Sequence, residues 1–358
     1  NKRSMKKILK NMLYACMTIV MVSLSSCDNE NVLIDNQADK DTSKKAIVFG
    51  NNLPVNSTRA SLTPAGGFPD GSVISVYGFQ TTGAAVDQNF KDQAVTKGGE
   101  KWTYSPVKYW NLTSTYEFYA VYPKDKISHT FNNETKMFAI DNFVVADDKD
   151  AQIDVMIAEK NTTSPLNIVN FNFNHLLSNV NFYFKTINTF DFNGIASIEV
   201  VEFDVEGICN KGSYQQTGNV EGTWTASTNG ADIYDFPKVT SGSVSDNTSH
   251  TALATDLLLL PQSLASADKK ITMTYRINYS DGTAARYTKS VALSEATFIK
   301  SKNGATSEDL TVWKPNYIYN YFLAVNPAIL PNGDSAVIEF TATVDEWQDE
   351  IDAEIEVK

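Results

Sequence analysis

The sequence is poor in the residues that most often build catalytic and metal sites. It has three histidines in 358 residues, and His129, His175 and His250 lie far apart without the spacing of metal ligands. Neither a His-Glu-x-x-His motif nor a Cys-x-x-Cys pair is present, which argues against zinc and thiolate clusters. A Gly-x-Ser-x-Gly motif and a phosphate-binding loop are missing too. We therefore expect a protein that is not an enzyme and carries no cofactor or metal.

Basic charge is also scarce. The chain has 30 Lys and Arg residues against 42 Asp and Glu residues, and its first 26 residues hold five of the basic ones and none of the acidic ones. Without that segment, 25 basic and 42 acidic residues remain, which is a formal charge of −17. A surface of this sign repels nucleic acid and anionic headgroups. The composition predicts a globular body with no nucleic-acid partner.

The N-terminal segment has the features of a secretory signal peptide. A basic head precedes the apolar run Met12–Leu24, which is short for a membrane span. The run ends in Leu-Ser-Ser-Cys, which resembles the lipobox of bacterial lipoproteins. We predict residues 1–26 as the signal peptide, with cleavage between Ser26 and Cys27 and acylation, including palmitate, at Cys27. The alternative is an ordinary signal peptide followed by an incidental cysteine.

Cysteine is too scarce for a disulfide framework. Cys16 would leave with the signal peptide and Cys27 would carry lipid, so Cys209 is the thiol that remains in the mature chain. An internal disulfide is then excluded, and stability must come from packing. We expect Cys209 to be a small buried hydrophobe. Residues 27–45 are polar and charged and predict a flexible lipidated spacer.

The sequence also lacks amphipathic helices longer than a couple of turns. Aromatic and β-branched residues recur instead, with turn signals about every 8–12 residues, which is typical of an all-β sandwich or barrel. A polar break at Glu159–Pro165 predicts an N-terminal domain, 46–165, and a C-terminal domain, 166–358. The predicted strands are 46–49, 73–79, 101–104, 116–122, 138–145, 153–158, 195–205, 257–260, 271–279, 286–293, 317–325 and 337–347.

Three details of the strand pattern are specific. The apolar positions change parity between Leu177 and Val180, so we expect a bulge or a break near Ser178–Asn179. Asp281-Gly282 stands between two alternating segments and predicts a type I′ hairpin. At the C-terminus, a half-buried strand is predicted because apolar residues alternate with charged ones at Ile351, Ala353, Ile355 and Val357.

Three features carry a weak functional signal beside a structural alternative. His175 lies on an apolar strand face and could be a base or a metal ligand, but we expect a hydrogen-bonded core histidine. The acidic run Asp147–Asp150 lacks the glycine and bidentate glutamate of a calcium loop, which favours an exposed turn. Four aromatic residues could stack on sugars, although core or cross-strand pairs are expected in an all-β protein: Trp102, Tyr104, Tyr109 and Trp110.

Eight stretches of the mature chain, in this order, resemble landmarks of the fimbrillin family, the type V pilins of Gram-negative anaerobes. Each is loose alone, and their order beside the lipobox and the acidic spacer carries the resemblance. The stretches are Ser57–Ala60, Gly71–Phe79, Lys101–Trp110, Phe118–Pro123, Phe173–Ser178, Leu258–Gln262, Trp313 with Tyr317–Leu323, and Thr343–Trp347.

The resemblance implies two tandem transthyretin-like β-sandwich domains and a structural subunit of a cell-surface fimbria (pilus or fimbrium) that serves cell adhesion. It implies export to the outer membrane as a lipoprotein, followed by a protease cut between Arg59 and Ala60. The strand Ala46–Phe49 would then leave, and a donor strand of another subunit would fill the groove. Residues 337–357, which end in the alternating strand described above, are the candidate donor region.

The implied partners are other fimbrillin subunits, the outer membrane through the lipid anchor, and a glycan or protein receptor on host or bacterial surfaces. Alternatives stay open at this point. Arg59 could be an ordinary exposed loop arginine, and some family members are anchor or tip subunits that do not polymerise. From another class, a surface lipoprotein that binds glycans would also fit the tether and the many aromatic residues.

Overall fold

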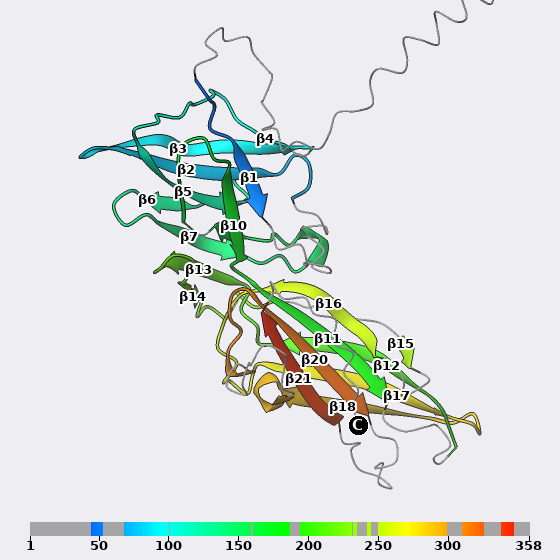
Figure 1. Ribbon diagram of the computed structural model, residues 1–358. Coiled ribbons are helices and arrows are strands. Elements are labelled where there is room, and N and C mark those ends of the chain that lie inside the picture. The colour runs from blue at the N-terminus through cyan, green and yellow to red at the C-terminus, as the bar shows by residue number, and fades with distance from the viewer. Residues whose placement is uncertain are drawn as a thin grey trace, which may run out of the picture. The chain divides into compact units, whose positions relative to one another are not determined.

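The structure is a computed structural model that describes residues 44–52, 68–99, 101–158, 160–186, 194–230, 232–234, 242–244, 250–298, 310–325 and 338–346. All of its strands belong to the compact unit Lys45–Lys358 (Figure 1). The described chain is all-β, as predicted, and its short 3-10 helices include η1 (Lys149–Ala151) and η2 (Leu293–Glu295). Over these residues, none of the helices has the length and apolarity needed to cross a membrane.

The strands are β1 (Phe49–Asn52), β2 (Val73–Thr82), β3 (Ala85–Gly98), β4 (Lys101–Thr103), β5 (Thr115–Tyr122), β6 (Thr130–Asn132), β7 (Met137–Val144), β8 (Met156–Ala158), β9 (Asn161–Thr163), β10 (Val169–His175), β11 (Ser178–Thr186), β12 (Ile195–Glu206), β13 (Lys211–Gln216), β14 (Gly222–Ala226), β15 (Gly242–Val244), β16 (Thr251–Leu259), β17 (Lys270–Tyr279), β18 (Ala284–Ala292), β19 (Thr297–Phe298), β20 (Tyr317–Val325) and β21 (Ile338–Glu346). The prediction for 317–325 matches β20 at both ends, and that for 116–122 misses one residue of β5.

The first sheet has the strand order β1-β10-β8-β5-β2-β3-β4, with β9 beside β5. Its pairings are antiparallel except for β1 with β10. β1 and β4 stand at opposite ends of this order and yet contact each other, so the sheet curls around its inner face. The buried residues on that face are called the curled-sheet core, and they include Ile47, Phe49, Phe90, Phe118 and Phe171.

The outer face of the first sheet is covered as well. Tyr77 and Tyr119 point away from the curled-sheet core and pack on Phe131 and Phe138 of a second sheet, with ring centroids 4.2 Å apart for Tyr77 and Phe131. This second sheet has the order β14-β13-β7-β6. Since β2 and β5 are covered on both faces, their sequences are almost continuously apolar rather than alternating.

The C-terminal part contains two further sheets, β16-β11-β20-β21-β19 and β15-β12-β17-β18. Their facing side chains form what we call the sandwich core, in which the ring of Phe182 (β11) lies 5.2 Å from those of Phe203 (β12) and Tyr321 (β20). β11 pairs with β20 in parallel and with β16 antiparallel. The run Leu257–Leu260 is buried throughout, as its continuous apolarity predicts.

The predicted break in the parity of apolar residues is present and has a structural cause. β10 ends at His175 in the first sheet, and β11 begins at Ser178 in the five-stranded sheet. The two residues between them, Leu176 and Leu177, are each 1% exposed. The chain therefore changes sheets at this point without exposing apolar surface.

The type I′ prediction for the hairpin between β17 and β18 was wrong. Type I′ needs a positive φ at both central residues, and of the two predicted residues only Gly282 has one, at 86°. The Gly282 N–H donates to the Tyr279 carbonyl over 3.0 Å. The loop is therefore a turn followed by a left-handed glycine, and Asp281 instead accepts hydrogen bonds from the backbone and hydroxyl of Thr283.

Pairing in the first two sheets crosses the predicted domain boundary at 165/166. β10, after that boundary, pairs with β1 and β8, and β13 pairs with β7. The division into two folding domains stays a prediction.

Candidate functional site

The segment Lys45–Asn52 lies between two other parts of the first sheet. On one side, the Ile47 N–H donates to Lys108 O over 2.8 Å, and the Trp110 N–H donates to Lys45 O over 3.0 Å. On the other side, β1 runs parallel to β10, where the Val169 N–H donates to Val48 O over 2.9 Å. The predicted strand Ala46–Phe49 is thus part of an inserted segment, and its regular ladder lies later than predicted, at Phe49–Asn52.

The side chains of this segment complete the curled-sheet core. Ile47 is 0% exposed and Phe49 is 3% exposed. The ring of Phe49 meets Phe90 at 5.3 Å and Phe118 at 5.7 Å, edge to face, and stacks on Phe171 at 5.9 Å. A fully buried side chain of this size contributes roughly 1.5–3 kcal/mol of hydrophobic stabilisation. Without the segment, the core would have an open groove lined by aromatic rings.

Tyr104 fixes the segment from the opposite wall of the groove. Its hydroxyl donates to Ile47 O over 2.9 Å, and its ring lies 5.4 Å from that of Phe49. Burial raises the pKa of Tyr104 to about 12, so the phenol stays protonated and able to donate at physiological pH.

Most predicted processing residues lie outside the described part of the chain. These are Ser26, Cys27, Arg59, Ala60, Ile351, Ala353, Ile355 and Val357. The described residues end at Asn52 and begin again at Phe68, whose ring packs on Trp102 at 5.3 Å and on Phe173 at 5.1 Å. Arg59 therefore stands in sequence between two segments that are both anchored in the curled-sheet core.

His175 is the hydrogen-bonded core histidine that was expected. It is 6% exposed, and its Nδ1 lies 2.8 Å from Oδ1 of the similarly buried Asp154. The acidic run forms η1, in which the Asp148 carboxylate accepts from the Asp150 N–H over 3.0 Å. Across the described residues, no three His, Cys, Asp or Glu side chains are placed to hold a metal ion.

The aromatic residues near the β4 strand belong mainly to the core, as expected for an all-β protein. Trp102 is 2% exposed and Trp110 is 8% exposed, and Trp110 meets Tyr116 edge to face at 4.7 Å. Of the four aromatic residues considered for sugar stacking, Tyr109 reaches solvent most, at 37%. Trp110 therefore offers no open ring face for a sugar.

Cys209 is less buried than predicted. It is of intermediate exposure, and its thiol lies 3.1 Å from Lys211 O and 3.4 Å from Ser227 O. The side chain sits among backbone carbonyls between β12 and β13 rather than in an apolar core, which explains the difference.

Sequence reasoning missed a polar cluster around Asp92 on β3. Asp92 Oδ1 accepts from the Ser75 hydroxyl and pairs with the Lys124 ammonium at 2.5 Å. Nε2 of His129 lies 3.7 Å from the same oxygen and 3.2 Å from the Tyr77 hydroxyl. No sequence motif joins these residues. The pairing of β2 with β3 brings Ser75 and Tyr77 near Asp92, and the segment between β5 and β6 supplies Lys124 and His129.

The fold and this inserted segment define a class: an all-β protein of stacked sheets, with a short edge strand completing its first core. A profile of fimbrillin-like proteins matches residues 58–347, which is most of the chain. The protein belongs to this family. Membership identifies it as a structural, non-enzymatic protein.

Comparison with solved structures includes a match that supports the fold. A fimbrial protein from Bacteroides vulgatus is 18% identical, with a TM-score of 0.59 over 84% of this chain and 99% of that chain. A more distant match is a fimbrilin from Porphyromonas gingivalis, which is 9% identical, with a TM-score of 0.41 over 84% of this chain and 97% of that chain. A search of curated proteins finds no match.

Proposed function

We propose that this protein is a structural subunit of a cell-surface fimbria, exported as a lipoprotein and assembled by donor-strand exchange that proteolysis triggers. Membership in the fimbrillin-like family supports a pilus-subunit and adhesion role. The observation that carries the finer proposal is the segment Lys45–Asn52, a short insert whose two large side chains fill a core built by strands of later sequence.

The insert is suited to leave without dismantling the sheet. Its ladder to β10 covers four residues, whereas β2 and β3 pair over most of their length. Departure would expose Phe90, Phe118 and Phe171 together with the unpaired edge of β10. An extended strand with apolar residues at every second position would satisfy both needs, since it supplies backbone hydrogen bonds and side chains for the pockets.

The chain contains a sequence of that type. Ile351, Ala353, Ile355 and Val357 alternate with charged residues. In the insert, the buried Ile47 and Phe49 alternate with Ala46 and Val48, which are of intermediate exposure. In this proposal, cleavage after Arg59 frees the insert, and the terminal strand of another copy or another fimbrillin subunit takes its place. The lipobox-like Leu24–Cys27 would deliver the precursor to the outer membrane.

The test is the N-terminal sequence and polymer state of the surface form. Wild type is expected to begin at Ala60 and to form polymers that resist dissociation in mild detergent. Arg59→Ala should keep the precursor N-terminus, acylated at Cys27, and stay monomeric. Arg286→Ala is the matched control, because it removes an exposed arginine of β18, remote in sequence from the cut. Polymers formed by Arg59→Ala would refute the proposal.

A second experiment addresses the donor strand. Deletion of residues 350–358 should leave a folded, protease-resistant monomer that accepts a donor strand and cannot give one. If the strand merely closes its own sandwich, the deletion will unfold the chain instead. Polymerisation of the truncated protein would contradict this part of the proposal.

A further inference from the structure

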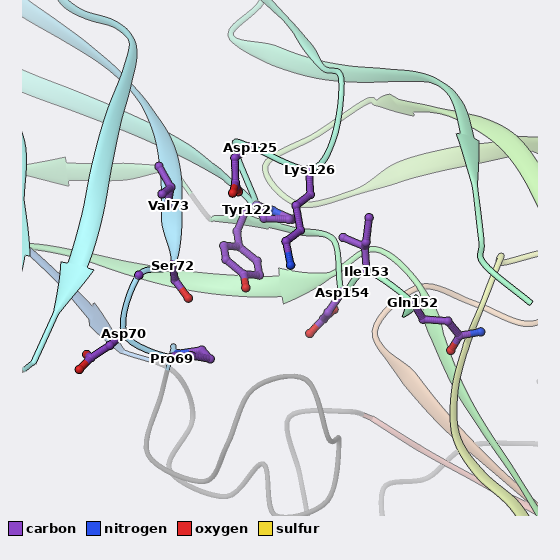
Figure 2. Close-up of a pocket in the computed structure, with 12 residues that line it drawn as sticks. Pro69, Asp70, Ser72, Val73, Tyr122, Asp125, Lys126, Gln152, Ile153 and Asp154 are labelled. Atoms are coloured by element: carbon purple, nitrogen blue, oxygen red, sulfur yellow. The ribbon is translucent and has the colours of Figure 1, made fainter. Parts of the chain in front are cut away.

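A pocket of about 270 Å³ opens where three segments of the first sheet meet. The turn before β2 supplies Asp70 and Ser72, the end of β5 supplies Tyr122, and the segment before β8 supplies Asp154 (Figure 2). Apolar side chains of Val73, Pro123 and Ile153 complete the lining; the full set also includes Pro69, Gly71, Asp125, Lys126 and Gln152. The pocket thus has both polar groups and apolar walls.

Asp154 is the buried charged group of this pocket. It is 4% exposed, and Figure 2 shows its carboxylate directed toward the space between Tyr122 and Pro69. Oδ1 is occupied by Nδ1 of His175, whereas Oδ2 has no hydrogen-bond partner in the described structure. Buried carboxylate oxygens nearly always have a hydrogen-bond partner in the protein. Without one, burial would remove their hydrogen bonds to water and put nothing in their place. Oδ2 is therefore placed to accept a hydrogen bond from a molecule bound in the pocket.

The charges around the pocket are mainly negative. Asp70 and Asp125 lie exposed at the rim, and the ammonium of Lys126 is the lining's cation. Among the ion pairs of the described residues, none joins Lys126 to these carboxylates. The pKa of the Tyr122 phenol is raised, first by burial and then by the carboxylates of Asp154 and Asp125. The field inside the pocket thus favours positive charge.

We propose that this pocket binds an organic cation, the ammonium or guanidinium group of a small molecule or of a basic side chain, with Asp154 as its charge partner. Such a donor forms a charge-assisted hydrogen bond to Oδ2, while its methylene stem contacts Val73 and Ile153. A bare metal ion fits less well, because the described residues offer no cluster of three ligating side chains. The proposal goes beyond the fimbrial function and does not rest on it.

Calorimetric titration of the purified protein tests the pocket with matched probes. n-Butylamine represents a free amine and Nα-acetyl-arginine amide represents a basic side chain, while n-butanol and Nα-acetyl-norleucine amide are their neutral counterparts. At least one cationic probe should bind saturably, and its neutral counterpart should not. Binding of butylamine alone assigns a small amine, and binding of the arginine derivative alone assigns a peptide side chain. Failure of both cations overturns the proposal.

Substitutions then locate the binding. Asp154→Asn should weaken it by at least about tenfold, since a charge-assisted bond is replaced by a neutral one. Asp87→Asn, an exposed aspartate of β3 outside the pocket lining, should leave it unchanged. Equal binding by wild type and Asp154→Asn would refute the assignment.

A second pair of variants covers the case in which loss of the His175 contact unfolds Asp154→Asn. Lys126→Met removes a competing cation from the rim and should tighten binding, and Asp125→Asn should weaken it. Both residues are exposed, so folding is expected to persist. If neither variant changes the affinity, the pocket is not the cation site.

Discussion

The curled-sheet core and the sandwich core are closed in different ways. The first is closed by a parallel ladder of four residues, in which Phe49 of β1 pairs with Val169 of β10. The second is built on long ladders, such as the β17–β18 hairpin, whose strands follow one another in sequence and pair from Lys270 to Asn278. One core depends on a short, distant insert. The other depends on long ladders, which are local between β17 and β18 and distant in sequence between β11 and β20.

This difference indicates which strand could be exchanged for a strand of another subunit. A strand that contributes few backbone bonds and two large side chains can be replaced by another of the same pattern, because the remaining ladders persist. A central strand such as β17 pairs on both sides and cannot leave without breaking two ladders. The following predictions test this contrast, from the largest expected effect to the smallest.

Phe49→Ala should destabilise the curled-sheet core by about 3–5 kcal/mol, because it leaves a cavity among Phe90, Phe118 and Phe171. Phe182→Ala in the sandwich core is the matched variant, with a similar expected cost. Amide hydrogen exchange should distinguish the two variants. Phe49→Ala should speed the exchange of backbone amides in β10 and β3 and leave that in β12 and β17 unchanged. Equal acceleration in both cores would show that they open as one unit and would break the comparison.

Gly78→Ala should cost about 1–3 kcal/mol through overpacking of the first sheet. A Cβ at this position would lie 2.7 Å from Phe90 Cδ2 and 2.9 Å from Phe118 Cδ1, both on rings fixed by the same core. Gly98→Ala is the control, because its Cβ would meet nothing within 4 Å. Chemical denaturation measures the free energy of unfolding, and equal values for the two variants would contradict the packing described for β2.

Gly282→Ala should destabilise the sandwich part by about 1–2 kcal/mol, for a purely conformational reason. The glycine has φ at 86°, and a Cβ there would meet no atom within 4 Å. The cost therefore arises from the left-handed backbone, whereas the cost at Gly78 arises from contact. Gly282→Asn should recover part of the loss, since asparagine tolerates this region better than alanine. Thermal unfolding of the proteins with glycine, asparagine and alanine at position 282 checks this order of decreasing stability.

Acidification should weaken the first region through His129. Its side chain is 6% exposed, and the pKa of the imidazole is lowered, first by burial and then by Lys124, against the opposing effect of Asp92. The unfolded chain therefore binds the proton more readily, so stability declines as the pH falls through the unfolded value of about 6.5. His129→Gln should reduce the difference in unfolding free energy between pH 7.5 and 5.5.

His250 provides the control for that experiment in the sandwich part. Its pKa is also lowered, first by burial and then by Lys185, so the sign of its effect is the same. If His250→Gln reduces the pH dependence more than His129→Gln, the polar cluster around Asp92 is not the main acid-sensitive element.

The sequence by itself determined the features that depend on one strand at a time. Alternation and aromatic enrichment identified β20 and β5 and the all-β class. The change of parity predicted a break near Ser178–Asn179, directly after the passage between sheets at Leu176 and Leu177. The scarcity of histidine and cysteine, and the order of the fimbrillin-like stretches, pointed to a structural protein. These signals are local, because burial of a strand face leaves its period in the chain itself.

Tertiary structure alone decided which strands meet. No local pattern shows that β13 pairs with β7 or that β1 lies parallel to β10. Nor does any local pattern show that Asp92 contacts Ser75, Lys124 and His129. The same holds for the partial exposure of Cys209, for the loop at Gly282, and for the pocket at Asp154. Apolar residues at every second position show which face of a strand is buried. Which strands lie beside it depends on long-range packing and on loops whose geometry this pattern does not encode.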